Sequence, residues 1–188
     1  MKLESKVYSF NFVITMAFNR KPKINKSEYE ENLLDIARVT RVVAGGKRLS
    51  FRATLVIGSR SKDKHEVGVG VCKGKDVAQA IQKASNKAKK NLITVPVVNE
   101  TIPHEVTAKY KASKVIIKPA KKGKGVRAGG AVRTVLKLAN ISNANAKILS
   151  SSSNAINNAR VTIIALSKLK DSFNKNIKEE KPEIKNKK

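Results

Sequence analysis

The sequence is poor in cysteine and in aromatic residues, and each deficit excludes something. The single cysteine, Cys72, excludes an internal disulfide and is typical of proteins from a reducing compartment. Together with His65 and His104 it does not complete the ligand set of a zinc site, so we expect no bound metal. Aromatic residues make up 4% of the 188 residues, so the core must be built from Val, Ile, Leu and Ala.

Long hydrophobic runs are also missing, and we expect no membrane partner because no segment has the length of a transmembrane helix. The stretch Val7–Phe18 is apolar but short, and polar residues interrupt it. It resembles a weak signal-peptide core, yet no small-residue cleavage site follows it. We expect residues 1–30 to be a flexible extension, with Met16 as an alternative start.

Acidic residues are outnumbered, and the resulting positive charge is the strongest feature of the sequence. Forty Lys and Arg stand against fourteen Asp and Glu, a net charge of +26. Residues 31–95 carry +9 and residues 96–170 carry +12, whereas the two ends carry only +3 and +2. Because such an excess opposes compaction, it indicates a polyanionic partner, most often nucleic acid. An anionic membrane surface or an acidic protein is a weaker alternative.

The segment 31–95 has the pattern of strands followed by a helix. Leu33–Val43 is rich in Ile and Val, and a Gly-Gly turn signal follows in Ala44–Lys47. Apolar and polar residues then alternate in Leu49–Ile57, and Val alternates with Gly in Val67–Val71. Residues 75–91 then place an apolar stripe on one helix face, at Val77, Ile81, Ala84, Ala88 and Leu92. The pattern predicts a three-stranded antiparallel sheet backed by one helix.

The segment 96–170 mixes strands and helices and is joined to the first near Val95–Val97. Strands are predicted at Val106–Tyr110, Val115–Lys118 and Ala146–Leu149, and helices at Ala131–Ala139 and from the cap Asn154 to Leu169. Residues 171–188 are rich in Lys, Glu and Asn, which predicts a flexible tail.

A glycine-rich turn, Lys121–Gly130, is the first candidate site. It matches the G-x-G-x-x-G/A dinucleotide fingerprint, but no acidic residue lies near position 148 and the following chain is too short for a doubly wound sheet. We therefore expect no cofactor and interpret the turn as an RNA phosphate site. Its backbone donors would be Gly123, Gly125, Gly129 and Gly130, and its cations Lys121, Lys122, Lys124 and Arg127. The alternative is a tight turn with solvated lysines.

The predicted hairpin is the second candidate site. Its basic residues are Arg41, Lys47, Arg48 and Arg52, which we expect to cluster at one end of a rigid sheet. No acidic residue lies between Ile36 and Lys62, which favours phosphate contact over a merely solvated face. Phe51 alternates with these cations and is expected in the core rather than as a base-stacking platform.

Catalysis has no evident basis in the sequence. His104 and Glu105 are neighbours on the chain, but neighbours on a strand point to opposite faces. Glu100 and Glu105 are the only acids in residues 96–170, so we predict no active site. Two alternatives to a structural RNA-binding protein stay open: a free-standing RNA-processing factor, and a small nucleotide-binding enzyme built on the glycine-rich turn.

Five blocks of sequence resemble one family. They are "RVVAGGKRLSF", "VGVGVCKGKDVAQAIQKA", "TIPHEV", "KPAKKGKGVRAGGAVRTVLKLA" and "SSNAINNARVTIIAL", and they occur in the order seen in the fifth protein of the small ribosomal subunit. The resemblance covers about Glu31 to Leu169, roughly three quarters of the chain.

The resemblance implies an α+β fold, with a double-stranded-RNA-binding-like domain over 31–95 and an α/β domain with a left-handed β-α-β crossover over 96–170. It implies a structural protein of cytoplasmic ribosomes that binds small-subunit rRNA, supports assembly and touches the fourth and eighth small-subunit proteins. It also places the protein near the incoming messenger RNA. The loop Val43, Ala44, Gly45, Gly46 and Lys47 would act in spectinomycin response and decoding accuracy. Ala44 stands where the family usually has lysine.

Overall fold

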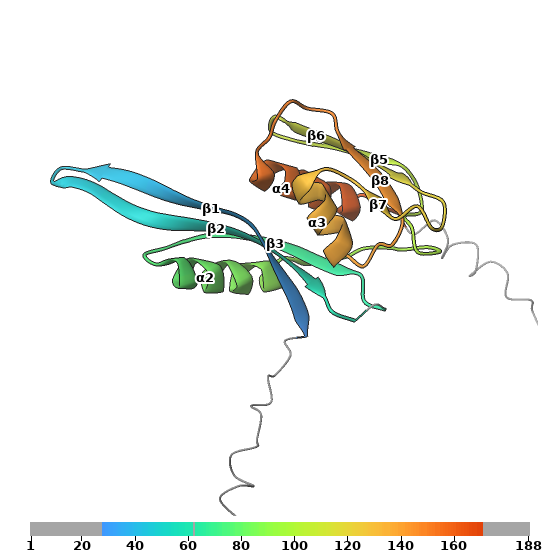
Figure 1. Ribbon diagram of the computed structural model, residues 1–188, viewed down its shortest axis with the longest axis horizontal. Coiled ribbons are helices and arrows are strands. Elements are labelled where there is room, and N and C mark those ends of the chain that lie inside the picture. The colour runs from blue at the N-terminus through green and yellow to red at the C-terminus, as the bar shows by residue number, and fades with distance from the viewer. Residues whose placement is uncertain (1–27, 62, 171–188) are drawn as a thin grey trace, which may run out of the picture.

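The computed structural model of the protein describes residues 28–61 and 63–170 and contains two four-stranded sheets and three helices (Figure 1). The elements are β1 (Tyr29–Val43), β2 (Gly46–Ser59), β3 (Glu66–Gly74), α2 (Val77–Lys90), β4 (Leu92–Thr94), β5 (Val106–Tyr110), β6 (Ser113–Pro119), β7 (Val126–Arg127), α3 (Gly130–Leu138), β8 (Ala144–Ile148) and α4 (Ala155–Ser167). β1 thus begins inside the predicted extension. The rest of that extension, with Val7–Phe18 and Met16, and the tail 171–188 lie outside the described residues.

The first sheet has the order β1-β2-β3-β4, all antiparallel, with α2 against one face. The prediction of three strands missed β4, whose Leu92 it assigned to the stripe of α2. The helix ends earlier because its cap residue Asn91 leaves helical geometry at φ −110° and ψ 34°. The chain then reverses, and Leu92–Thr94 pair with Glu66–Gly68.

Glycines let α2 approach the sheet closely. A Cβ on Gly70 would lie 2.0 Å from the carbonyl oxygen of Ala84, and one on Gly74 would lie 2.6 Å from the nitrogen of Ala80. The glycine face of β3 therefore meets the helix backbone directly. The alternating valines, Val67 and Val69, belong to the opposite face and pack into a larger core.

That larger core joins the two halves of the chain. Val56 of β2 is fully buried in one cluster with Leu136 of α3 and Leu166 of α4. Gly58 of the same strand lies so near α3 that a Cβ would come within 2.0 Å of the carbonyl oxygen of Leu138. The alternation in β2 predicted a basic-polar face, but the second half of the chain covers that face from Thr54 onwards.

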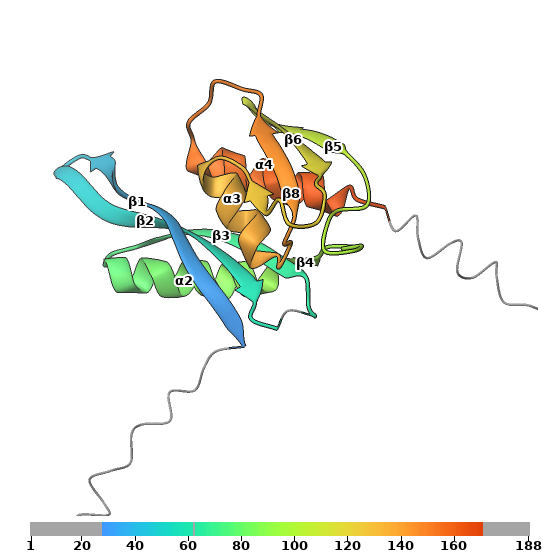
Figure 2. The ribbon, with the colours of Figure 1, turned by 45° about the vertical axis from the view of Figure 1, so that its right-hand side comes forward.

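The second sheet has the order β5-β6-β8-β7, in which β7 runs parallel to β8 and the other pairs are antiparallel. α3 connects β7 to β8 and therefore forms the β-α-β crossover, whose left-handedness stays a prediction. α3 and α4 pack between this sheet and the first one (Figures 1 and 2). The fold is the predicted α+β arrangement, with a sheet and helices in each half.

The β1–β2 hairpin projects beyond the rest of the first sheet (Figure 1). Pairing between β2 and β3 ends at Phe51 and Gly74, whereas β1 and β2 stay paired as far as Val43 and Gly46. The strands are thus anchored at their base and form a free two-stranded ribbon at the other end. We call residues 41–48 the hairpin tip.

Candidate RNA interface

The hairpin tip turns at Ala44 and Gly45, as the Gly-Gly signal predicted. Gly46 has φ +131°, a conformation that L side chains rarely adopt, which explains the glycine. Arg41 and Arg48 lie directly opposite each other across the two strands, and both are exposed. Facing like charges are unfavourable in a bare ribbon, and a bound anion would relieve the repulsion.

Lys47 and Arg48 project from opposite sides of the ribbon. The pairing places Arg48 on one side with Arg41, and Lys47 on the other with Val42 and Leu49. Val42 is 75% exposed and Leu49 is 52% exposed. One side of the ribbon is therefore cationic. The other side is mainly apolar and also carries Lys47.

Arg52 does not belong to the hairpin tip, contrary to the prediction. It lies four residues along β2 from Arg48, where it is half-buried and paired with Ala37 of β1. Its Nη2 is 3.6 Å from Oδ2 of Asp35. The absence of acids between Ile36 and Lys62 is real, but the sequence does not show which acid on a neighbouring strand faces a cation. Contact of Arg52 with RNA therefore stays a prediction, for a half-buried side chain that already faces one acid.

The glycine-rich turn is bonded to the residue before β8, and this also corrects the prediction. Gly123 and Gly125 have φ +88° and +66°. Their N–H groups donate to Oδ1 of Asn143, at 3.0 and 3.1 Å. Asn143 is buried directly before β8, which runs parallel to β7 beside the turn. These two N–H groups therefore already have an acceptor and are not free phosphate donors.

The start of α3 is a separate feature, because β7 intervenes between it and the two hydrogen-bonded glycines. Gly129 is the cap residue, with φ −81° and ψ 146°, and no side chain caps the helix. The first N–H groups of a helix have no partner within the helix. Gly129 and Gly130 are thus the part of the predicted phosphate turn at which donors remain for an anion.

The predicted cations of the turn are all exposed. They are Lys121, Lys122, Lys124 and Arg127. Lys122 places its Nζ 3.7 Å from Oε1 of Glu100, an exposed ion pair that contributes little to stability. The turn therefore presents exposed positive charge, and the start of α3 beside it has no side-chain cap.

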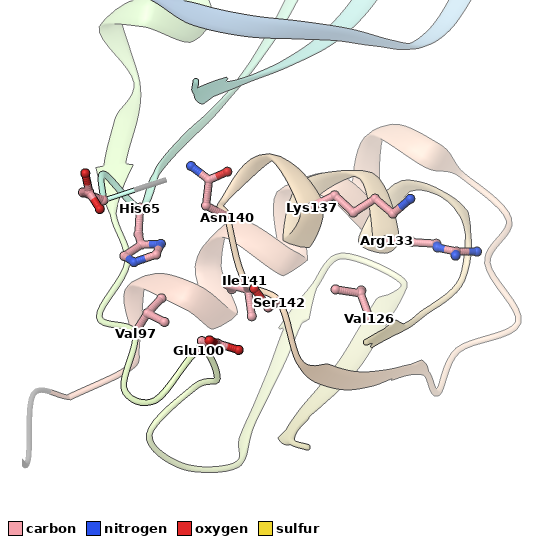
Figure 3. A pocket seen from close by; sticks show the side chains of 10 residues that line it. His65, Val97, Glu100, Val126, Arg133, Lys137, Asn140, Ile141 and Ser142 are labelled. Carbon is pink, nitrogen blue, oxygen red and sulfur yellow. The ribbon is translucent and has the colours of Figure 1, made fainter. Parts of the chain in front are cut away.

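Two further cations on α3 were missed. Arg133 and Lys137 are exposed and line a cleft of about 760 Å³ between α3, the β2–β3 loop and the segment after β4 (Figure 3). Their spacing of four residues on the predicted helix is the signal that would have found them.

The end of α3 is fastened to the first half of the chain at the same cleft. Asn140, at φ +55°, donates through Nδ2 to the carbonyl oxygens of Ser59, Ser61 and Lys64 at 2.9, 2.8 and 3.1 Å. His65 Nδ1 lies 3.1 Å from the carbonyl oxygen of Ala139. These bonds hold the two halves of the molecule in one orientation, which fixes the hairpin tip relative to the glycine-rich turn.

The described residues hold no group of three or more His, Cys, Asp or Glu side chains placed to bind a metal ion. None of the helices among them is long and apolar enough to cross a membrane. Phe51 is half-buried and packs against the core beside α2, as predicted.

Comparison with known proteins assigns the chain to a family. The profile of ribosomal protein S5, N-terminal domain, matches residues 29–96, and that of ribosomal protein S5, C-terminal domain, matches residues 108–180. Two relatives are called small ribosomal subunit protein uS5c. The Spinacia oleracea protein is 47% identical over 87% of this chain and 54% of its own length, and that of Rhodomonas salina is 48% identical over 81% and 89%.

A bacterial relative, small ribosomal subunit protein uS5 of Thermotoga neapolitana, is 46% identical over 79% of this chain and 82% of its own length. The chain spans about half of the Spinacia protein but most of the other two. The resemblance seen in the five sequence blocks is thereby confirmed. The chain belongs to the ribosomal protein S5 family and is a structural component of the small ribosomal subunit rather than an enzyme.

Proposed function

We propose that this protein binds small-subunit rRNA through two separate cationic elements, the hairpin tip and the glycine-rich turn with the start of α3. The observation that supports this most is the hairpin itself. It is anchored on both sheet faces at its base, yet its tip is free and presents Arg41, Lys47 and Arg48 to solvent. A ribbon of this shape reaches into RNA without moving the core.

Through these contacts the protein supports subunit assembly and, near the incoming messenger RNA, contributes to decoding accuracy. Its protein neighbours in this proposal are the fourth and eighth small-subunit proteins. The loop from Val43 to Lys47 carries the spectinomycin and fidelity role. Ala44 removes one cation from that loop, so the remaining charge lies on Lys47 and its neighbour Arg48.

The hairpin is tested by Lys47→Ala and Arg48→Ala, made singly and together. Both side chains are exposed, so we expect unfolding free energies within about 0.5 kcal/mol of the parent. The double variant should weaken binding to small-subunit rRNA and should change spectinomycin protection or stop-codon readthrough in reconstituted ribosomes. Because the two side chains leave opposite sides of the ribbon, the single variants should affect different rRNA nucleotides in footprinting.

The matched control is Lys168→Ala with Lys170→Ala, which removes the same charge from two exposed positions after α4. Should the hairpin double variant and this control match the parent in binding, protection and readthrough, the tip is a solvated turn. Sucrose-gradient fractionation addresses the alternative of an RNA-processing factor. The proposal requires the protein to travel with the small subunit at moderate salt, whereas recovery only in free fractions would contradict it.

A further inference from the structure

The second sheet has one open face. Along β5, β6 and β8, every second residue is buried or half-buried on the side of the core that the sheet shares with α3 and α4. The side chains between them point to the opposite side, away from both helices (Figure 2). Six of these form the surface that we call the outer sheet face, and all but the half-buried Ile116 are exposed: Lys109, Lys114, Ile116, Lys118, Asn145 and Lys147.

Most of the positive charge on this face is not neutralised by the protein. The strand register places Lys109 directly opposite Lys114. Lys118 pairs with Glu105, whose Oε2 lies 3.2 Å from the lysine Nζ. The other three lysines of the face have no ion-pair partner in the described part of the chain. Like charges directly opposite each other on a sheet are unfavourable, so the face indicates an anionic partner that relieves the repulsion.

The kind of side chain on the face indicates the chemistry of that partner. Cores of protein–protein interfaces are rich in Tyr, Trp and Arg and poor in Lys, and bases stack on aromatic rings or on Arg. The outer sheet face has four lysines and neither an aromatic ring nor an arginine. Lysine binds phosphate as a point charge, and Asn145, opposite Lys118, offers an amide donor to a phosphate or ribose oxygen. The face therefore fits the sugar-phosphate backbone of RNA better than bases or a protein surface.

The outer sheet face continues into the glycine-rich turn but is separate from the hairpin tip. Arg127 of β7 lies beside Asn145 in the register of β7 and β8, so the cations of the turn extend the same surface. The hairpin tip belongs to the first sheet, and α3 and α4 lie between the two sheets (Figures 1 and 2). The outer sheet face thus points away from the first sheet. The hydrogen bonds of Asn140 between the two halves keep both surfaces in one relative orientation.

We propose that the outer sheet face binds the backbone of a second RNA segment, so that one protein molecule holds two RNA segments at once. The first segment lies on the hairpin tip, and the second runs over the glycine-rich turn and across β8, β6 and β5. The inference rests on the proposed RNA binding and deepens it, because it adds a surface and makes the protein a bridge within the folded rRNA. Contact with the backbone alone makes the second site insensitive to base sequence.

The surface is tested by removing three of its charges together, with Lys109→Gln, Lys114→Gln and Lys147→Gln. Binding to small-subunit rRNA is measured by filter binding at several salt concentrations. Each phosphate contact contributes about 0.7 to the slope of log affinity against log salt on single strands, so the slope of this sheet-face variant should be shallower by about 2. The matched control removes the same charge from exposed lysines on or beside α2, by Lys75→Gln, Lys83→Gln and Lys90→Gln. An equal change of slope in the control would show that only the overall charge matters, which would overturn the proposal.

Hydroxyl-radical footprinting of the rRNA distinguishes two bound segments from one. The sheet-face variant and the hairpin variant, Lys47→Ala with Arg48→Ala, should each lose protection of a different set of riboses, whereas the control should keep both sets. If the two variants lose the same riboses, one segment runs over both surfaces and the bridge is refuted. If the sheet-face variant keeps every protection, the face does not bind RNA. A parent that protects no ribose would instead refute the proposed function itself.

Circular dichroism checks folding, and Lys114→Glu keeps the test decisive if the triple variant does not fold. This change replaces repulsion from Lys109 with a cross-strand ion pair, so Tm should stay or rise while rRNA binding falls. A folded Lys114→Glu protein that binds rRNA as the parent does refutes the face. A protein partner is the other possible occupant. It is shown, and the RNA proposal overturned, if the sheet-face variant protects rRNA as the parent does but fails to enter reconstituted small subunits that accept the control.

Discussion

Replacing Gly129 with Asp separates the stability of the fold from RNA binding at one position. Gly129 has φ −81° and ψ 146°, so its backbone needs no glycine. A Cβ there would meet only Cδ1 of Ile148, at 3.6 Å, an ordinary contact. Gly129 caps α3 without a side-chain bond, and Asp is among the preferred cap residues. The substitution therefore improves the helix while it places an anion where a phosphate would bind.

The expected magnitudes follow from these two effects. A better cap, a favourable charge at the helix start and a less flexible unfolded chain together raise the unfolding free energy by about 1 kcal/mol. For a chain of this size that raises Tm by about 3 °C. Repulsion between the carboxylate and a phosphate about 4 Å away in water-like surroundings costs about 1 kcal/mol, or about fivefold in rRNA affinity.

The assays are thermal unfolding followed by circular dichroism and rRNA binding at several salt concentrations. Gly129→Asn is the matched control, because it provides a similar cap without the charge and should keep the affinity of the parent. A Gly129→Asp protein that is more stable and still binds as the parent does would show that no phosphate lies at the start of α3. A fall in Tm would refute the reasoning about the cap.

Three further predictions concern charge and packing. Affinity for small-subunit rRNA should fall steeply between low and moderate salt, because rRNA phosphates release counterions when the protein's cations bind them. An affinity that does not change with salt in filter binding would contradict binding through these cations. Asn143→Ala should lower the unfolding free energy by about 1–3 kcal/mol, because the N–H groups of Gly123 and Gly125 lose their acceptor, whereas the exposed Asn145→Ala on β8 should not. Gly58→Ala should destabilise by about 3 kcal/mol or more in urea titration, since its Cβ would overlap the carbonyl of Leu138. Gly45→Ala, with nothing within 4 Å of its Cβ, is its control, and equal midpoints for the two would disprove the close approach.

The sequence by itself determined the local elements and the partner class. The Gly-Gly signal predicted the turn at Ala44 and Gly45, and the apolar spacing predicted α2 to within two residues at each end. Asn154 caps α4 as predicted, with its Oδ1 accepting from Ile156 and Asn157. These features depend on residues two to four positions apart, so the pattern along the chain contains all the information they need.

The tertiary structure decided which of the predicted site residues are available. Asp35 reaches Arg52 from a neighbouring strand, and Asn143 reaches Gly123 and Gly125 from the start of β8. The second half of the chain likewise covers the face of β2 that the alternation predicted to be solvated. Each of these contacts joins residues that are 17 or more positions apart, and no periodicity along the chain encodes such a distance. Which of the predicted cations and backbone donors have a protein partner was therefore settled only by the packing of the two sheets around α3 and α4.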